Sequence, residues 1–226
     1  MIFSEKLNHQ SVFKYLGHFE ENDSDYYISK FFDDNNLFKF LEDKVNSKIR
    51  IKEDILWHIF LQCLKGLKYL HNKGIIHRDI KLANIFVDDQ NNIQIGGFDI
   101  AAVMEENQVK YFTDDPQLQK ELILNCRDEI GTMNYMAPEI ENSQHYDQRA
   151  DIYSLGITFY ALCYYNFPYL NGNNLNELME DNLYSYELKK NIYMMIQKDQ
   201  NKRPTSDEMY AQLENDYIQK YGKKNI

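Results

Sequence analysis

The chain has 226 residues, of which 43% are hydrophobic and 14% aromatic, and its formal net charge at pH 7 is −10. This apolar content is ample for a sizeable core in one large domain or two modest ones. The acidic balance argues against a nucleic-acid partner, because nucleic-acid phosphates demand a basic surface.

Targeting and membrane signals are missing from the printed sequence. It contains no run of eighteen apolar residues, no signal-peptide pattern at Met1 and no lipid-acceptor sequence at either end. We therefore expect an intracellular, cytoplasmic protein without a membrane partner. The three cysteines, Cys63, Cys126 and Cys163, lack metal-ligand spacing, and two lie on helical apolar faces, so we expect reduced core residues.

Periodicity predicts two long helices and a short strand. Residues 53–72 carry apolar side chains at helical spacing, and Gly74 stands where a left-handed residue would end that helix. Residues 93–95 alternate like a strand, after an Asn-rich turn at 89–92. An apolar run opening at Asp151 predicts a buried helix, with this aspartate as a candidate N-terminal cap.

Three other pieces are expected to lack regular structure. Residues 171–176 are rich in asparagine and are typical of a turn, and residues 217–226 are expected to be a fraying tail. The segment from Gly97 to Glu139 is long, and its middle, residues 105–115, is acidic and amide-rich with few apolar anchors, which predicts a mobile insertion. None of these pieces indicates a second domain.

The most informative motif is HRDIKLANIF at residues 77–86. Asp79 can orient a substrate hydroxyl, Lys81 can meet the charge of a migrating phosphoryl group, and Asn84 can hold a metal ion. Three side chains that phosphoryl transfer uses therefore lie within six residues.

This motif resembles the catalytic loop of the protein kinase family, and a lysine two positions after the aspartate is typical of the serine/threonine branch. The resemblance covers most of the chain. It implies an α+β, protein-kinase-like fold: a mainly helical C-terminal lobe with an incomplete antiparallel β N-terminal lobe. It also implies ATP and magnesium as cofactors of an active form. A protein substrate or an active kinase relative would be the partner, and the sequence does not indicate the oligomeric state.

The resemblance assigns residues 1–226 to a single kinase domain, with 1–32 as the remnant of the small lobe and hinge and 33–226 as the helical lobe. The turn and strand that follow the small lobe's regulatory helix correspond to Leu7, Asn8, His9, Gln10, Val12, Tyr15 and Leu16. The strand and hinge that line an adenine pocket correspond to Ser29, Lys30, Phe31 and Phe32, with Ser29 as the gatekeeper candidate.

The resemblance also implies regulatory and structural residues. Thr132 belongs to the substrate-side loop, Glu139 and Arg203 form an ion pair that ties down the activation segment, and Asp151 braces the catalytic-loop backbone. Arg78 would dock a phosphorylated residue of that segment. Residues 126–130 carry no hydroxyl, so one hypothesis pairs Arg78 with Asp128 or Glu129; the alternative is two solvated acids.

The sequence departs from the family's pattern at the metal site. The family reads Asp-Phe-Gly after the strand at 93–95, whereas this chain reads Gly97, Phe98 and Asp99. Gly97 therefore leaves the magnesium site one oxygen ligand short, unless Asp99 reaches back as a second metal candidate beside Asn84.

The family's glycine-rich phosphate loop, strand lysine and helix glutamate are missing from the printed sequence as well. One hypothesis is a catalytically impaired, pseudokinase-like binding or regulatory module. A second is an active ATP- and magnesium-dependent serine/threonine kinase whose small lobe is encoded upstream, in which Gly97→Asp is expected to raise activity. A third is a piece that aggregates because it exposes a sheet edge.

Overall fold

The computed structural model describes residues 7–21, 24–29, 35–105, 108–111, 133–142, 146–166, 179–180 and 182–222. Several predicted features lie outside these residues: Lys30, Phe31, Phe32, Cys126, Asp128, Glu129, Thr132, the turn at 171–176 and most of the activation segment.

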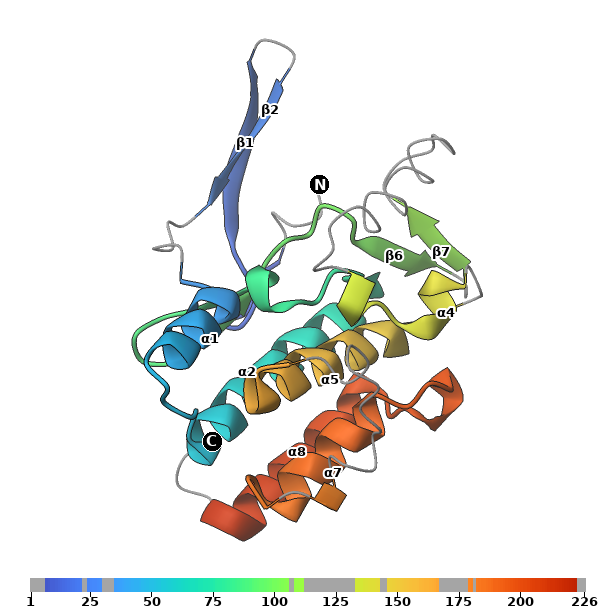
Figure 1. Cartoon of the computed structure of the whole chain (residues 1–226). Helices are drawn as coiled ribbons and strands as arrows, with labels where there is room; N and C mark the ends of the chain where they lie inside the picture. The colour runs from blue at the N-terminus through green and yellow to red at the C-terminus, as the bar shows by residue number, and fades with distance from the viewer. Residues whose placement is uncertain are drawn as a thin grey trace.

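Two long helices form the centre of the molecule. Helix α2 (Glu53–His71) crosses α5 (Arg149–Tyr164), and the rings of Phe60 and Phe159 stack between them with centroids 3.8 Å apart (Figure 1). Every residue of α5 from Ala150 to Cys163 is buried. A helix that is buried all round needs apolar residues on every face, which explains the apolar run after Asp151.

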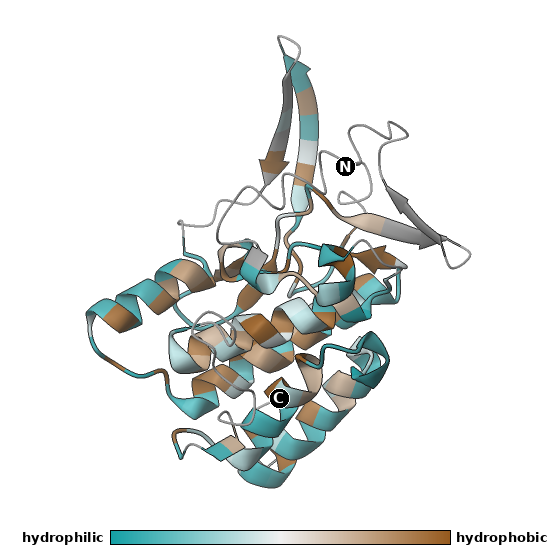
Figure 2. Cartoon of the chain, turned by 45° about the vertical axis from the view of Figure 1, so that its right-hand side comes forward, coloured by the Kyte–Doolittle hydropathy of each residue, from teal (hydrophilic) through white to brown (hydrophobic). Residues whose placement is uncertain are grey.

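Further helices cover this centre. Helices α7 (Tyr186–Met195) and α8 (Ser206–Tyr221) pack below α5 and α2, while α1 (Leu37–Asn46) and the short α4 (Pro138–Glu141) flank them. Hydrophobic positions concentrate in the middle of this body (Figure 2), and hydrophilic ones prevail outside.

The strands form three small antiparallel groups. Strand β1 (Tyr15–Glu21) pairs with β2 (Ser24–Ser29), and β4 (Ile85–Val87) pairs with β5 (Ile93–Ile95). Strand β3 (Ile75–Ile76) pairs with β6 (Ala102–Glu105), which pairs with β7 (Gln108–Tyr111). A mainly helical body with small antiparallel sheets is the predicted α+β class.

The local predictions near the catalytic loop are confirmed. Helix α2 begins at Glu53 and is capped by Asn72, and Gly74 then adopts a φ of 73°, the left-handed conformation expected there. The turn before β5 is held by the carboxylate of Asp88, whose Oδ1 accepts hydrogen bonds from the backbone N–H groups of Gln90 and Asn92.

Cys63 and Cys163 are free and buried, as predicted, and burial raises the pKa of the Cys63 thiol. Within the described ranges, no helix is both long and apolar enough to span a bilayer.

Three predictions are wrong. Part of the segment expected to lack regular structure is a strand, since residues 108–111 form β7 and pair with β6. Residues 217–221 are not a fraying tail but the last turns of α8, because the ring of Tyr217 is buried against Trp57 at a centroid distance of 6.2 Å. Asp151 is not the N-cap of α5 either. Gln148 holds that position, and Asp151 lies inside the first turn.

Glu53 joins three helices at one end of the body. Its carboxylate accepts hydrogen bonds from the indole of Trp57 (2.9 Å) and from the hydroxyl and backbone N–H of Ser185, the N-cap of α7. Lys220 of α8 lies 2.9 Å away. Partial burial raises the pKa of Glu53, but these donors outweigh it and lower the pKa to about 2.

We predict that Glu53→Gln destabilises the fold by about 1 kcal/mol at pH 7, a modest loss because solvent screens a partly exposed carboxylate. Because the pKa of Glu53 is lower in the folded protein, its ionised carboxylate stabilises the fold at pH values above its unfolded pKa of 4.5. This stabilisation is lost as the pH falls from 4.5 to about 2. Denaturant unfolding followed by fluorescence of Trp57, the single tryptophan, measures both effects. The exposed Glu187→Gln is the control, and equal stability of the two variants would contradict the prediction.

Candidate active site

The motif at 77–86 forms a loop between β3 and β4, closed by a single turn of 3-10 helix (Leu82–Asn84). Within it Lys81 Nζ lies 3.0 Å from Asp79 Oδ2. Asn84 Nδ2 donates to the same oxygen at 2.7 Å and to the backbone carbonyl of Asp79 at 2.8 Å. The structure therefore brings all three predicted catalytic side chains together, with one oxygen of Asp79 receiving two donors.

One buried carboxylate fixes the start of this loop. Asp151 is fully buried, and its two oxygens accept the backbone N–H groups of His77 and Arg78, each at 2.8 Å. Since Asp151 lies on α5, the loop backbone is fastened directly to the central helix.

A hydrogen-bonded histidine supports the same carboxylate. His71, at the end of α2, lies 3.0 Å from Asp151 Oδ2 through Nε2 and 2.9 Å from the hydroxyl of Ser206 through Nδ1. Burial acts to raise the pKa of Asp151, but the hydrogen bond from His71 and the backbone donors lower it overall. No sequence pattern pointed to His71 or Ser206 as part of this network, although His71 lies within the predicted helix.

His77 is structural in the same network. Its Nε2 lies 2.8 Å from the Gly96 carbonyl, which can only accept, so Nε2 carries the proton and Nδ1 is the acceptor for the N–H of Asp79. Burial lowers the pKa of His77, and the nearby carboxylates of Asp151 and Asp79 oppose this only partly. The imidazole is therefore neutral at pH 7.

Arg78 reaches across the loop toward the activation segment. Its Nε donates to the carbonyl of Ile100 at 2.5 Å, and Nη1 donates to the hydroxyl of Tyr146 at 3.3 Å. Its backbone φ is 67°, so the loop turns sharply at this residue. The hypothesis that Asp128 or Glu129 pairs with Arg78 stays a prediction, because both acids lie outside the described residues.

Gly97 lies against the side chain of Asn84. Its φ is 75°, and a Cβ added there would stand 2.6 Å from both Nδ2 and Oδ1 of Asn84, closer than such atoms approach. The amide of Asn84 thus fills the space into which a side chain at position 97 would grow.

Gly97 offers no side-chain oxygen, so a magnesium ion at this point would find one ligand fewer than in the family's pattern. In the described ranges, no three His, Cys, Asp or Glu side chains gather closely enough to hold a metal by themselves. Phe98 is buried beside His77, which leaves Asp99 exposed in the following turn. Metal binding by Asp99 stays a prediction that would require this turn to rearrange.

The structure contains the ion pair expected between Glu139 and Arg203. Both side chains are buried, and the guanidinium donates through Nη1 and Nη2 to the two carboxylate oxygens at 2.6 Å each. This bidentate pair fastens α4, at the end of the activation segment, to the segment before α8.

The expected adenine side of the site is only partly described. Ser29 is the last residue of β2, while Lys30, Phe31 and Phe32 lie outside the described residues. Their roles as cofactor-binding residues stay predictions.

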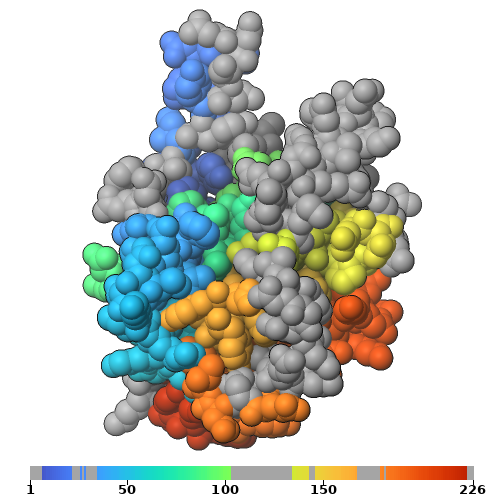
Figure 3. Space-filling view, viewed as in Figure 1, coloured from blue at the N-terminus to red at the C-terminus, as the bar shows by residue number. Residues whose placement is uncertain are grey.

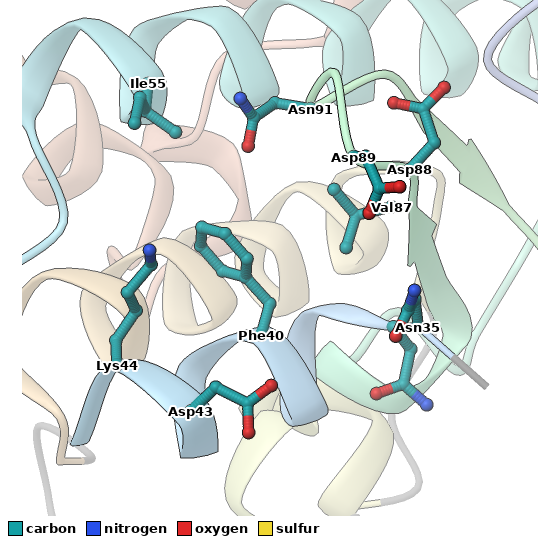
Figure 4. A pocket seen from close by; sticks show the side chains of 10 residues that line it. Asn35, Phe40, Asp43, Lys44, Ile55, Val87, Asp88, Asp89 and Asn91 are labelled. Atoms are coloured by element: carbon teal, nitrogen blue, oxygen red, sulfur yellow. The ribbon is translucent and has the colours of Figure 1, made fainter. Parts of the chain in front are cut away.

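A cavity of about 360 Å³ opens elsewhere, between α1, the start of α2 and the β4–β5 turn (Figure 4). Phe40, Ile55 and Val87 are its apolar lining; polar residues complete it: Asn35, Asn36, Asp43, Lys44, Asp88, Asp89 and Asn91. No residue of the loop from His77 to Asn84 lines it, so this cavity is separate from the candidate active site.

Comparison with known proteins shows which family the chain resembles. A family model described as protein kinase domain matches residues 1–217. Serine/threonine-protein kinase Nek5 of Homo sapiens is 32% identical over 182 residues, covering 79% of this chain and 23% of that protein. Serine/threonine-protein kinase Nek1 of Mus musculus is 28% identical over 223 residues, covering 95% of this chain and 17% of that protein.

A third relative is the probable serine/threonine-protein kinase nek2 of Dictyostelium discoideum, which is 27% identical over 219 residues. The match covers 91% of this chain and 49% of that protein. The chain therefore spans less than half the length of each of these three relatives.

We predict that Asp151→Asn destabilises the fold by about 2–4 kcal/mol, because one amide oxygen cannot satisfy both loop N–H groups and His71. Asp207→Asn, at a half-exposed carboxylate on α8, is the matched control and should cost less than about 0.5 kcal/mol. Urea unfolding followed by Trp57 fluorescence measures both. A stability loss no larger than that of the control would show that Asp151 does not carry the loop.

We also predict that Gly97→Ala and Gly97→Asp each lower stability by about 1–3 kcal/mol, from the positive φ and the contact with Asn84. Gly17→Ala, where an added Cβ meets no atom within 4 Å, should be near neutral. Unchanged stability of Gly97→Asp would mean that Asn84 moves aside easily.

Proposed function

Because this chain belongs to the protein kinase family, we propose that it is a serine/threonine-kinase-type domain impaired in phosphoryl transfer. In this proposal it acts as a pseudokinase-like binding or regulatory module whose partner is a protein substrate or an active kinase relative. Residues 1–226 are assigned to a kinase domain, in which residues 1–32 belong to the small lobe and hinge and residues 33–226 to the helical lobe.

The observation that carries the proposal is the packing of Asn84 against Gly97. In the family, an aspartate at position 97 supplies the oxygen that holds magnesium against the nucleotide phosphates. Here glycine supplies none, and the amide of Asn84 occupies the adjoining space. ATP and magnesium would supply the phosphoryl group and its charge neutralisation, but this site offers the metal one ligand fewer than the family's pattern.

The catalytic loop is compatible with either role of Asp79. Its Oδ2 accepts Asn84 Nδ2 and faces Lys81 Nζ, so this oxygen is engaged within the loop. A carboxylate has a second oxygen that can accept a hydrogen bond from a substrate hydroxyl. The proposed impairment therefore rests on the metal site and not on these hydrogen bonds.

A second candidate function is active transfer of the ATP γ-phosphate to protein serine or threonine by a longer form that carries its own small lobe. The proximity of Asp79, Lys81 and Asn84 favours it, since all three remain within one loop. In that form Asp79 would orient the hydroxyl and Lys81 would stabilise the transferred charge. Gly97→Asp would then need the Asn84 side chain to move before it could raise activity.

We predict no phosphate transfer by purified chain 1–226 incubated with labelled ATP, magnesium or manganese, and a generic serine/threonine acceptor protein. A missing metal ligand removes positioning on which this reaction almost wholly depends. We also expect no rise in melting temperature with 1 mM Mg·ATP, on the order of physiological nucleotide concentration. Filter counting and a fluorescence melt of Trp57 measure the two quantities.

The matched control is Asp79→Asn, prepared and assayed in parallel. Transfer by the parent chain that is lost in Asp79→Asn would establish the active alternative and overturn the impairment. Transfer that persists in both would identify a contaminating kinase. A cooperative Trp57 melt in the same sample shows that absence of transfer comes from a folded protein.

A further inference from the structure

The cavity beside α1 lies between walls that hydrogen bonds hold in place (Figure 4). The chain enters α1 through Asn35, whose carbonyl accepts the backbone N–H of Val87 on β4 at 2.9 Å. Asn36 then caps the helix by accepting the N–H of Lys39 at 3.0 Å. These contacts hold α1 against β4, and Figure 3 shows α1 (blue) and the β4–β5 turn (green) at the same edge of the body.

The turn between β4 and β5 forms another wall, and it is fastened to its own backbone and to α2. The carboxylate of Asp88 accepts the backbone N–H of Asn92 at 2.8 Å. The side chain of Gln62 on α2 donates to the carbonyl of Asn91 at 3.0 Å and accepts the N–H of Ile93 at 3.1 Å. A ligand therefore meets walls that are already ordered, which lowers the entropy cost of binding.

The lining combines an apolar floor with an acidic rim. Val87 is buried and Phe40 and Ile55 are half-buried, so the apolar side chains lie deepest. Three exposed aspartates line the cavity as well: Asp43, Asp88 and Asp89. Lys44 is the one basic residue among the described lining residues, so three carboxylates against one ammonium leave the lining with a net charge of −2.

The three carboxylates differ in how they are engaged. Asp43 forms an ion pair with Lys39 of its own helix at 3.0 Å. Asp88 uses its carboxylate on the backbone of the turn. Asp89 has no ion-pair partner among the residues that the structure describes, so it is the carboxylate most available to a cation from outside.

We propose that this cavity binds an extended segment of a partner protein in which lysine or arginine stands beside a large aliphatic residue. The basic side chain lies against Asp89 at the turn, on the side of the cavity opposite Lys44 (Figure 4). The aliphatic side chain covers the floor formed by Phe40, Ile55 and Val87.

Several features favour a protein segment over a small free cation. Water screens an exposed carboxylate, so an isolated ammonium group gains little from it. An aliphatic side chain on the floor adds apolar burial below the polar rim, the usual pattern of an anchor at a protein interface. The amides of Asn35 and Asn91 line the same cavity and can both donate to and accept from a main chain. The chain's net charge of −10 also attracts a basic partner over distance.

This inference goes beyond the proposed function, because an active and an impaired form of the chain would carry the same cavity. No residue of the loop from His77 to Asn84 lines it. Binding there is therefore measured without phosphate transfer.

The first test is fluorescence anisotropy of fluorescein-labelled peptides titrated with purified chain 1–226 to about 500 µM. The probes are Gly-Arg-Arg-Leu-Leu-Gly and two versions with one or two glycines between the arginines and the leucines. We expect a dissociation constant on the order of 50 µM for the best spacing, since the site is small. Replacing both arginines by glutamate, or both leucines by serine, should weaken binding at least about tenfold.

Variants of the chain locate the site. Asp89→Lys should weaken binding about tenfold, and Ile55→Arg, which puts a cation on the apolar floor, should abolish it up to 500 µM. The matched control is Glu187→Lys, which changes the net charge as Asp89→Lys does but lies on α7, away from the cavity, and should bind like the parent. A cooperative Trp57 melt of each variant shows that a loss of binding does not come from unfolding.

A photocross-link gives a second, direct location. A benzoylphenylalanine in place of the first leucine of the best peptide should, on irradiation, attach to α1, the start of α2 or the β4–β5 turn. Peptide mapping by mass spectrometry identifies the attachment point.

Absence of binding by all three spacings up to 500 µM, about ten times the expected dissociation constant, would overturn the proposal. Unchanged binding by Asp89→Lys and Ile55→Arg, or cross-links confined to other segments, would overturn its location. Equal affinity for N-acetyl-arginine amide, measured by competition, would identify a site for small cations and overturn the protein segment as ligand. Each of these results leaves the proposed impairment of phosphate transfer as it stands.

Discussion

The arrangement of this site depends on one buried carboxylate. Asp151 has no solvent exposure, and it accepts the two N–H groups that begin the catalytic loop while contacting His71 of α2. Burying a charge without such partners costs free energy, so the fold requires the carboxylate and its hydrogen-bond donors together. Through this residue the central helix α5, the end of α2 and the loop act as one rigid unit.

Once the loop is fixed, its side chains have little freedom. His77 reaches the carbonyl of Gly96, and the backbone N–H of Gly96 donates to the carbonyl of Asn84, so the segment after β5 is tied to the loop at both points. Gly97 follows directly in a left-handed conformation against Asn84. Glycine at this position is thus part of the packing of the site.

The helical body and the β1–β2 hairpin differ in how their stability arises. The body has buried apolar packing, the Glu139–Arg203 pair and the Glu53 cluster, which together connect its helices. The hairpin rests on its own strand pairing and leaves large apolar side chains exposed. The same chain therefore combines a helical body around a buried core with a hairpin whose apolar side chains are exposed.

The sequence by itself determined the family, the α+β class, helix α2 with its glycine stop, and the three neighbouring residues Asp79, Lys81 and Asn84, because these depend on local spacing. The sequence also showed that Gly97 stands where the family has a metal-binding aspartate. Only the tertiary structure decided that Asn84 fills that space, that His71 and Ser206 support Asp151, and that Tyr217 belongs to a helix. These features depend on contacts between residues far apart in the chain, such as Tyr217 with Trp57, and local pattern carries no information on which distant side chains will meet.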